Sequence, residues 1–242
     1  MGELGKTPAG AFTYRISCRN LLLYYITDRT QFPGNGTAQR RALLDKIAEA
    51  AACGVDFIQL REKDLPTRDL EILAQEAVET VREQAQPGNE KILRTRLLIN
   101  SRVDVAIASG ADGVHLRSDD ISTGDARRIW ARGARAPIDR EGSSPIIAVS
   151  CHTAEEVARA ASEGADFAVF APVFEKKDMP NARAAGLAAL RDACQKHIPV
   201  LALGGVNLGN ARSCIESGAA GVAGIRLFQE RDIAEVVRLL RS

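Results

Sequence analysis

The chain has 242 residues, of which 45% are hydrophobic and 26% are charged, a balance typical of a globular protein with a substantial core. Its 32 basic and 31 acidic side chains give a formal net charge of +1, so no overall field favours nucleic acid or an anionic membrane. No apolar run reaches the ~20 residues of a membrane helix, and the N-terminus lacks an apolar signal core, so we expect a cytoplasmic protein. Five scattered cysteines without a C-x-x-C pair argue against a zinc site or a disulfide framework.

Eight short apolar runs, several of them rich in β-branched residues, are predicted to be buried parallel strands. In chain order they lie at about 21–27, 57–61, 96–100, 113–117, 146–150, 167–173, 199–204 and 221–226. The segments between and after them have helical spacing and lie at 39–52, 67–82, 103–109, 123–131, 154–162, 183–196, 210–217 and 232–240. This alternation predicts an α/β fold.

Four similar phrases punctuate these elements and begin at Gly54, Gly110, Gly164 and Gly218, with steps of 56, 54 and 54 residues between the glycines. A helical pattern precedes each glycine and an apolar run follows it. Each glycine is therefore predicted to end a helix in the left-handed conformation and to lead into a strand. Each step holds two strand–helix units, so four steps predict eight.

Eight units favour a single (β/α)₈ TIM barrel over residues 21–242 as the catalytic domain. A doubly wound open sheet would show the same alternation, but the repeat is regular and runs the whole length. Residues 1–20 fit no unit and are predicted to be an N-terminal extension. Residues 134–145, with two prolines, are predicted to be a surface excursion.

Because the active site of a barrel lies at the carboxyl ends of its strands, polar residues there need an explanation. The second strand leads into Gln59, Arg61 and Lys63, which alternation would place on one face. A guanidinium fork beside an ammonium suits a phosphate or diphosphate ligand. The alternative is that both cations pair with Asp28, Asp64 or Asp120 in a solvated network.

Further polar residues follow the next strands. Asn100 ends the third and Ser150 the fifth. His152 is a candidate general acid or base, although a structural hydrogen bond would also explain it. Asp120 is either a Mg²⁺ ligand or a helix N-terminal acid. His115 and His197 are interpreted as structural.

The last two predicted strands suggest a second anion site. The seventh ends in Gly204 and Gly205, whose backbone a phosphate could approach, and the eighth leads to Arg226. Glycines alone would also be explained by turns, so the site depends on Arg226 joining them.

Seven phrases, in order over residues 22–240, resemble the thiamine phosphate synthase and thiazole tautomerase (TenI-like) family. They are Tyr25-Ile26-Thr27-Asp28, Gln59-Leu60-Arg61-Glu62-Lys63-Asp64, Leu98-Ile99-Asn100, Gly113-Val114-His115-Leu116, Ser150-Cys151-His152-Thr153, Phe170-Ala171-Pro172-Val173-Phe174 and Ala202-Leu203-Gly204-Gly205-Val206.

The resemblance implies a Mg²⁺-assisted transferase of thiamine biosynthesis. Such a synthase joins a pyrimidine methyl diphosphate to a thiazole phosphate and releases diphosphate, through a pyrimidine carbocation. It implies these roles: Gln59, Arg61, Lys63 and Asn100 for the pyrimidine diphosphate, Asp120 for Mg²⁺, Ser150 for the pyrimidine and Gly205 for the thiazole phosphate.

The chain departs from the synthase pattern at three positions. Ser101 stands where synthases have a second metal-binding aspartate, and Met179 where they have a loop lysine that Lys176 or Lys177 could replace. Arg226 stands where a serine is usual. We therefore expect a synthase, with a thiazole tautomerase that uses His152 as the first alternative and a non-catalytic thiazole or thiamine phosphate-binding barrel as the second. The sequence leaves open whether the chain forms a homo-oligomer.

Overall fold

The computed structural model describes residues 21–84, 95–133, 144–175 and 184–242. The predicted extension at 1–20, most of the excursion at 134–145, and Lys176, Lys177 and Met179 lie outside these residues. Within them, no helix combines the length and the hydropathy needed to cross a bilayer. The four described cysteines, Cys53, Cys151, Cys194 and Cys214, are free thiols.

Eight parallel strands form a closed barrel in sequence order, as the repeat predicts. They are β1 (Leu22–Ile26), β2 (Phe57–Leu60), β3 (Arg96–Asn100), β4 (Gly113–Leu116), β5 (Ile146–Cys151), β6 (Phe167–Phe170), β7 (Val200–Ala202) and β8 (Gly221–Gly224). The barrel closes where Leu22 of β1 pairs in register with Gly221 of β8. This closure rules out the open sheet, in which each outer strand would have a neighbour on one side only.

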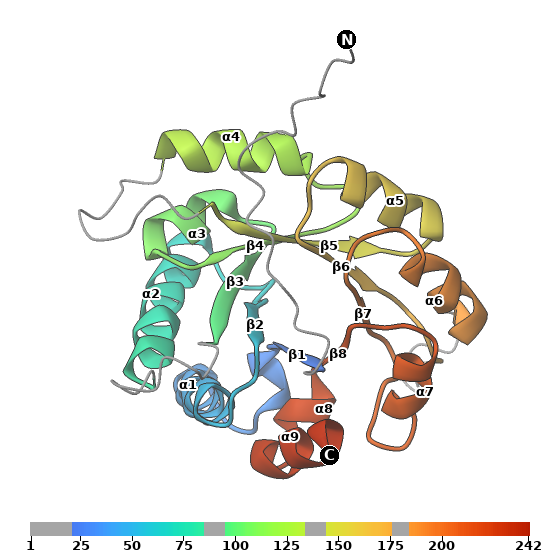
Figure 1. Cartoon of the computed structure of the whole chain (residues 1–242). Coiled ribbons are helices and arrows are strands. Elements are labelled where there is room, and N and C mark those ends of the chain that lie inside the picture. Colours follow the sequence, from blue (N-terminus) through green and yellow to red (C-terminus); the bar gives the residue numbers. More distant parts are fainter. Residues whose placement is uncertain (1–20, 85–94, 134–143, 176–183) are drawn as a thin grey trace.

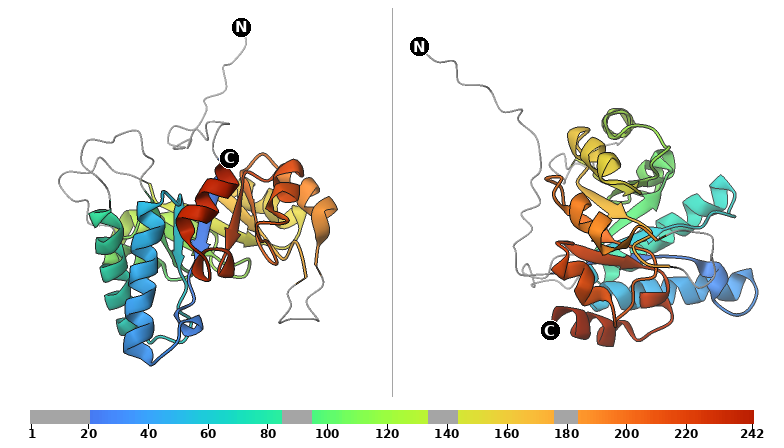
Figure 2. Two further views of the ribbon diagram at one scale, coloured as in Figure 1. Left: turned by 90° about the horizontal axis from the view of Figure 1, so that it is seen from below. Right: turned by 90° about the vertical axis from the view of Figure 1, so that its right-hand side faces the viewer.

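Helices surround the barrel and lie side by side around it (Figure 1; Figure 2). They are η1 (Arg29–Gln31), α1 (Gly36–Ala52), α2 (Thr67–Glu83), α3 (Val103–Ser109), α4 (Thr123–Gly133), α5 (Ala154–Ser162), α6 (Gly186–Cys194), α7 (Ala211–Glu216), α8 (Arg226–Gln229) and α9 (Ile233–Arg241). The last helix, α9, packs beside α1 and completes the ring. The strand predicted at 221–226 ends at Gly224, and the short helix α8 begins at Arg226.

Two apolar layers enclose the strands. One fills the barrel interior, where the Phe57 and Phe167 ring centroids lie 4.8 Å apart and Tyr24 packs edge-on against both rings. The larger layer lies between the strands and the helices. Toward the carboxyl ends of the strands the buried residues turn polar, with Gln59 and His115 each 2% exposed. Polar groups in this position need partners, because burial without hydrogen bonds is costly.

The glycines of the four phrases have the predicted conformation. Gly54, Gly110, Gly164 and Gly218 have φ angles of 77°, 70°, 84° and 100°. Each lies just after a helix, in the left-handed region that favours glycine. The repeat thus marks four helix ends that each lead into an even-numbered strand.

Three of the four phrases carry an aspartate two residues after the glycine, and these aspartates have a structural role. Asp56, Asp112 and Asp166 precede β2, β4 and β6, and a carboxylate oxygen of each accepts from a backbone N–H at or near the start of the preceding odd-numbered strand. The donors are Leu23 at 2.7 Å, Leu97 at 2.9 Å and Ile147 at 2.7 Å. An arginine also pairs with each carboxylate: Arg241, Arg96 and Arg127. The aspartates therefore tie neighbouring strands together at their amino ends, away from the carboxyl ends where the buried residues turn polar.

Replacing Asp56 with alanine is expected to lower the free energy of unfolding by about 2 to 3 kcal/mol, because the Leu23 N–H and the Arg241 guanidinium lose a buried partner. Chemical denaturation followed by circular dichroism measures this loss. Arg212→Ala is the control, since its ion pair with Glu216 is exposed on both sides. Equal stability of the Asp56→Ala and unmodified proteins would contradict the role.

Candidate active site

A chain of hydrogen bonds joins the carboxyl ends of β2, β3 and β4. The Gln59 side-chain amide donates to Asn100 Oδ1 at 3.0 Å, and the Asn100 amide donates to Ser101 Oγ at 3.2 Å. The Ser101 hydroxyl then donates to Asp120 Oδ2 at 2.7 Å. We call Gln59, Asn100, Ser101 and Asp120 the rim chain. It fixes three of the predicted site residues relative to one another.

Asp120 is held as a carboxylate. Its Oδ2 also accepts from the Arg117 backbone N–H at 2.8 Å, and the Arg117 guanidinium lies 3.3 Å from Oδ1. Burial opposes ionisation, but these hydrogen bonds outweigh it and lower the pKa of Asp120. Asp120 does not cap α4, because the Ser122 hydroxyl accepts from the Asp125 backbone N–H in the first turn of that helix. Asp120 belongs to the rim instead.

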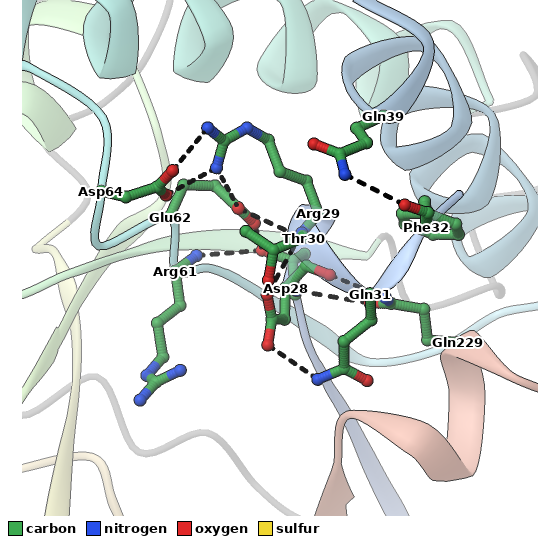
Figure 3. A network of polar contacts seen from close by, with 11 residues as sticks. Asp28, Arg29, Thr30, Gln31, Phe32, Gln39, Arg61, Glu62, Asp64 and Gln229 are labelled. Carbon is green, nitrogen blue, oxygen red and sulfur yellow. Dashed lines mark hydrogen bonds and ion pairs between the residues drawn. The ribbon is translucent and has the colours of Figure 1, made fainter. Parts of the chain in front are cut away.

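Arg61 directly follows β2, and its backbone N–H donates to Thr27 Oγ1 at 3.0 Å. Its side chain points away from the acidic residues around it (Figure 3). No described residue accepts a hydrogen bond from its guanidinium, which is only partly exposed. Burial lowers the pKa of Arg61, although Asp28 and Glu62 oppose this shift. A half-buried guanidinium without such a partner is suited to bind an anion.

A network beneath Arg61 explains its orientation. Glu62 is buried and accepts from the Thr27 hydroxyl at 2.6 Å and from the Arg29 backbone at 3.0 Å. The Arg29 guanidinium forms two hydrogen bonds with Asp64, at 2.6 and 2.7 Å, and lowers the pKa of that carboxyl (Figure 3). We call Thr27, Arg29, Glu62 and Asp64 the anchoring network. It holds the turn after β2 from the side opposite the Arg61 guanidinium.

The anchoring network argues against the alternative in which Arg61 pairs with nearby carboxylates. Asp64 is bound by Arg29, Asp120 by Ser101 and Arg117, and Asp28 accepts from Thr30 and Gln31.

Lys63 lies in an exposed turn beyond Leu60, where β2 ends. Strand alternation therefore does not reach Lys63, which corrects the prediction that strand geometry aligns it with Gln59 and Arg61.

Ser150 lies at the end of β5, inside the barrel. Its hydroxyl is 2.8 Å from Nε2 of His115, whose Nδ1 is 2.9 Å from the Tyr24 hydroxyl. Tyr24, His115 and Ser150 come from β1, β4 and β5, so they connect the apolar interior to the rim. From the sequence alone, His115 is interpreted as structural. Strand alternation with the apolar Val114 and Leu116, which pack against α3 and α4, would have placed it on the inner face.

His152 and Cys151 follow Ser150 but face different surroundings. His152 is exposed, its backbone N–H donates to Glu156 at 2.6 Å, and its Nδ1 donates to the Ala171 carbonyl at 2.7 Å. A carbonyl only accepts, so a neutral His152 keeps its lone pair on Nε2.

Cys151 is fully buried, and burial raises the pKa of its thiol to about 12. Cys151 is therefore not a nucleophile at neutral pH.

Gly204 and Gly205 lie in the loop after β7, with φ angles of 91° and 67°. A Cβ on Gly204 would lie 2.7 Å from Pro172, and one on Gly205 would lie 2.7 Å from Phe174 Cβ. Both glycines are thus required by close packing against the loop after β6.

Arg226, the other residue of the predicted second anion site, is exposed and begins α8, two residues after β8 ends. Lys176 lies outside the described residues.

A cavity of about 180 Å³ opens beside the rim between the ends of β4 and β5. Asp120 and Ser150 both line it, together with Arg117 and Arg159. The predicted metal ligand and the predicted pyrimidine contact therefore border one space. Within the described residues, no group of three or more histidine, cysteine or acidic side chains is arranged to hold a metal ion.

The sequence profile of the thiamine monophosphate synthase family (TMP-TENI) matches residues 23–228. The chain belongs to this family. The thiamine-phosphate synthase of Methanoculleus marisnigri is 37% identical over 223 residues, which cover 91% of this chain and 93% of that protein. That of Syntrophomonas wolfei is 36% identical over 225 residues, covering 91% and 94%. The predicted family resemblance is confirmed.

A solved structure gives the same result. Thiamine phosphate pyrophosphorylase from Pyrococcus furiosus superposes with a TM-score of 0.71 at 30% identity, over 93% of this chain and 95% of that chain. 3-Hexulose-6-phosphate synthase superposes with a TM-score of 0.55 at 15% identity and supports the fold alone. The two sequence relatives and this structural neighbour are thus named thiamine-phosphate synthase or thiamine phosphate pyrophosphorylase.

Proposed function

We propose that the chain is a thiamine-phosphate synthase that couples hydroxymethylpyrimidine diphosphate to thiazole phosphate and releases diphosphate. The observation that carries this is the position of the half-buried Arg61 guanidinium and the Asp120 carboxylate among the residues at the carboxyl ends of β2 to β4. A leaving diphosphate needs a cation and a metal ligand of this kind. The names of the relatives support transfer over tautomerisation.

In this reaction the bond between the pyrimidine methylene carbon and the diphosphate oxygen breaks, and its electron pair leaves with diphosphate. The thiazole nitrogen then forms the new bond to the methylene carbon. Arg61 and Lys63 would hold the negative charge that grows on the leaving group, while Gln59, Asn100 and Ser150 would orient the pyrimidine diphosphate. The protein supplies position and charge, and no side chain forms a covalent bond with the substrate.

The donor set at Asp120 fits Mg²⁺ that arrives with the substrate. One carboxylate faces the rim beside the Ser101 hydroxyl, and Mg²⁺ in proteins often uses one or two carboxylates plus waters and phosphate oxygens. Bound there, Mg²⁺ would neutralise charge on the diphosphate. The Arg117 ion pair would have to loosen, at small cost because the Arg117 side chain is 55% exposed.

The thiazole phosphate would bind across the ends of β7 and β8. Gly204 and Gly205 bring the backbone of the β7 loop close to the β6 loop without intervening side chains. Arg226, at the start of α8, would add a guanidinium on the other side of this phosphate. Lys176 remains a candidate for the diphosphate.

Replacing Ser101 with aspartate is expected to lower the Mg²⁺ concentration that gives half-maximal activity by roughly tenfold, because a second carboxylate would join Asp120. The φ angle of Ser101 is 60°, which aspartate tolerates better than most residues. In metal-free buffer the two carboxylates repel, so the melting temperature should fall. A Mg²⁺ titration with unchanged midpoint would contradict the metal site.

Two assays on one preparation distinguish transfer from tautomerisation. The proposal predicts thiamine phosphate from the two substrates and no conversion between thiazole phosphate tautomers. A tautomerase would show the reverse, with proton transfer that depends on His152 and persists in chelator. Binding of thiazole phosphate without either activity would instead indicate a non-catalytic barrel.

A further inference from the structure

His115 lies inside the barrel between two hydroxyl groups, and the reaction described above gives it no role. Its Nδ1 is 2.9 Å from the Tyr24 hydroxyl and its Nε2 is 2.8 Å from the Ser150 hydroxyl. Its side chain also stacks with the Tyr24 ring, at a centroid distance of 5.7 Å. His115 is 2% exposed and Tyr24 is fully buried. A buried polar group this well partnered fixes proton positions as well as packing.

The imidazole of His115 is neutral. Burial lowers its pKa to about 3, and the charge of Arg61 acts in the same direction. Burial likewise raises the pKa of Tyr24, so the phenol keeps its proton. A neutral imidazole carries one N–H and one lone pair, so one neighbouring hydroxyl receives a hydrogen bond from His115 and the other donates one.

The surroundings of Tyr24 decide which nitrogen carries the proton. The phenol lies among apolar side chains that include Phe57 and Phe167, and His115 is the hydrogen-bond partner of its hydroxyl among the described residues. If Nδ1 were protonated, the phenol proton would have no acceptor in a fully buried position. The favourable arrangement is Tyr24 donating to Nδ1, with the proton of His115 on Nε2.

We propose that Tyr24 and His115 are positioning residues that fix the direction of the Ser150 hydroxyl. His115 donates its Nε2 proton to Ser150 Oγ, so the Ser150 proton turns toward the barrel mouth. There it donates to an acceptor atom of the substrate, such as a nitrogen of a pyrimidine. No other described group accepts this proton. The identity of the acceptor rests on the proposed function, whereas the proton positions do not.

The tautomer is tested first, by long-range ¹H–¹⁵N NMR of the unmodified protein. The chain has three histidines, so the spectrum of a His115→Gln variant identifies the His115 signals. We expect one protonated Nε2 and one unprotonated Nδ1, without titration between pH 6 and 8. A protonated Nδ1, or an imidazolium, would overturn the proposal.

Kinetics test the action through Ser150. His115→Leu removes the donor and should lower kcat/KM for the pyrimidine diphosphate roughly tenfold. His115→Gln places an amide N–H near the position of Nε2 and should restore most of that loss. In a Ser150→Ala background, His115→Leu should cost less than about twofold, because the group through which it acts is gone.

The two proposals fail in different ways. An undiminished effect of His115→Leu in the Ser150→Ala background would overturn the positioning role while leaving synthase activity established. Absence of thiamine phosphate formation by the unmodified protein would overturn the proposed function, and with it a pyrimidine acceptor for Ser150. The NMR experiment decides the proton positions in either case, even if the leucine variant fails to fold.

Discussion

Replacing Arg61 with alanine is expected to lower kcat/KM for the pyrimidine diphosphate by roughly 10²- to 10³-fold, the cost of losing one preorganised charge at a leaving group. The guanidinium is partly buried, and the Arg61 backbone is fixed by a hydrogen bond to Thr27, whose hydroxyl is in turn bound by Glu62. Little reorganisation is needed when the anion binds, so the loss should appear in kcat as well as in KM. Steady-state formation of thiamine phosphate measures both constants.

Two variants make the Arg61 result specific. Arg61→Lys keeps the charge but removes the two-pronged geometry, so it should recover only part of the activity. Arg212→Ala, an arginine 91% exposed on α7, should leave activity unchanged and controls for net charge. Equal losses in the lysine and alanine variants would favour a role for the fork geometry alone. Full activity of Arg61→Ala would contradict the diphosphate site.

Replacing Asp120 with asparagine is expected to lower kcat by roughly 10²-fold and to weaken the response to Mg²⁺, because the amide keeps the size but loses the charge. Hydrogen bonds from Arg117 and Ser101 lower the pKa of Asp120 despite burial, so the unmodified carboxylate stays ionised as pH falls from 8 to 6. Its contribution would be lost only as pH falls through that lowered pKa. Activity against Mg²⁺ concentration, measured at several pH values, checks both points.

Asp119 provides a matched control for Asp120. It is the preceding residue, its side chain is 72% exposed, and it pairs with the same Arg117. Asp119→Asn should therefore change activity less than about twofold, since exposed ion pairs contribute little. Equal effects of the two substitutions would indicate that general charge at this turn matters, and would contradict a specific metal ligand at Asp120.

Most of the fold could be predicted from the sequence because its local signals agree. Left-handed glycines, short apolar runs and helical spacing recur at nearly constant steps, and these are properties of neighbouring residues. The ends of elements were less certain. Strands β1, β2, β4, β6, β7 and β8 end before the predicted runs do. After β6 and β7 the apolar run is longer than the strand because Val173 and Leu203 continue to pack and hydrogen-bond beyond the strand end.

The site was predicted less completely, because its interactions join residues that are distant in sequence. Gln59, Asn100 and Asp120 could be placed at the rim from strand order. The anchoring network, however, depends on an ion-pair contact between neighbouring units. Arg29, which follows β1, reaches Glu62 and Asp64, which follow β2. The interior position of His115 beside Ser150 depends on the register between β4 and β5. Such contacts follow from three-dimensional register rather than from local pattern.

The most direct test of the proposed function is incubation of the purified protein, free of host synthase, with hydroxymethylpyrimidine diphosphate and thiazole phosphate, with Mg²⁺ or with chelator. We expect that Mg²⁺ yields thiamine phosphate and diphosphate in equal amounts, that omitting either substrate abolishes both products, and that chelator strongly reduces them. Absence of thiamine phosphate in the complete reaction would contradict the synthase, and undiminished formation in chelator would contradict the metal site at Asp120.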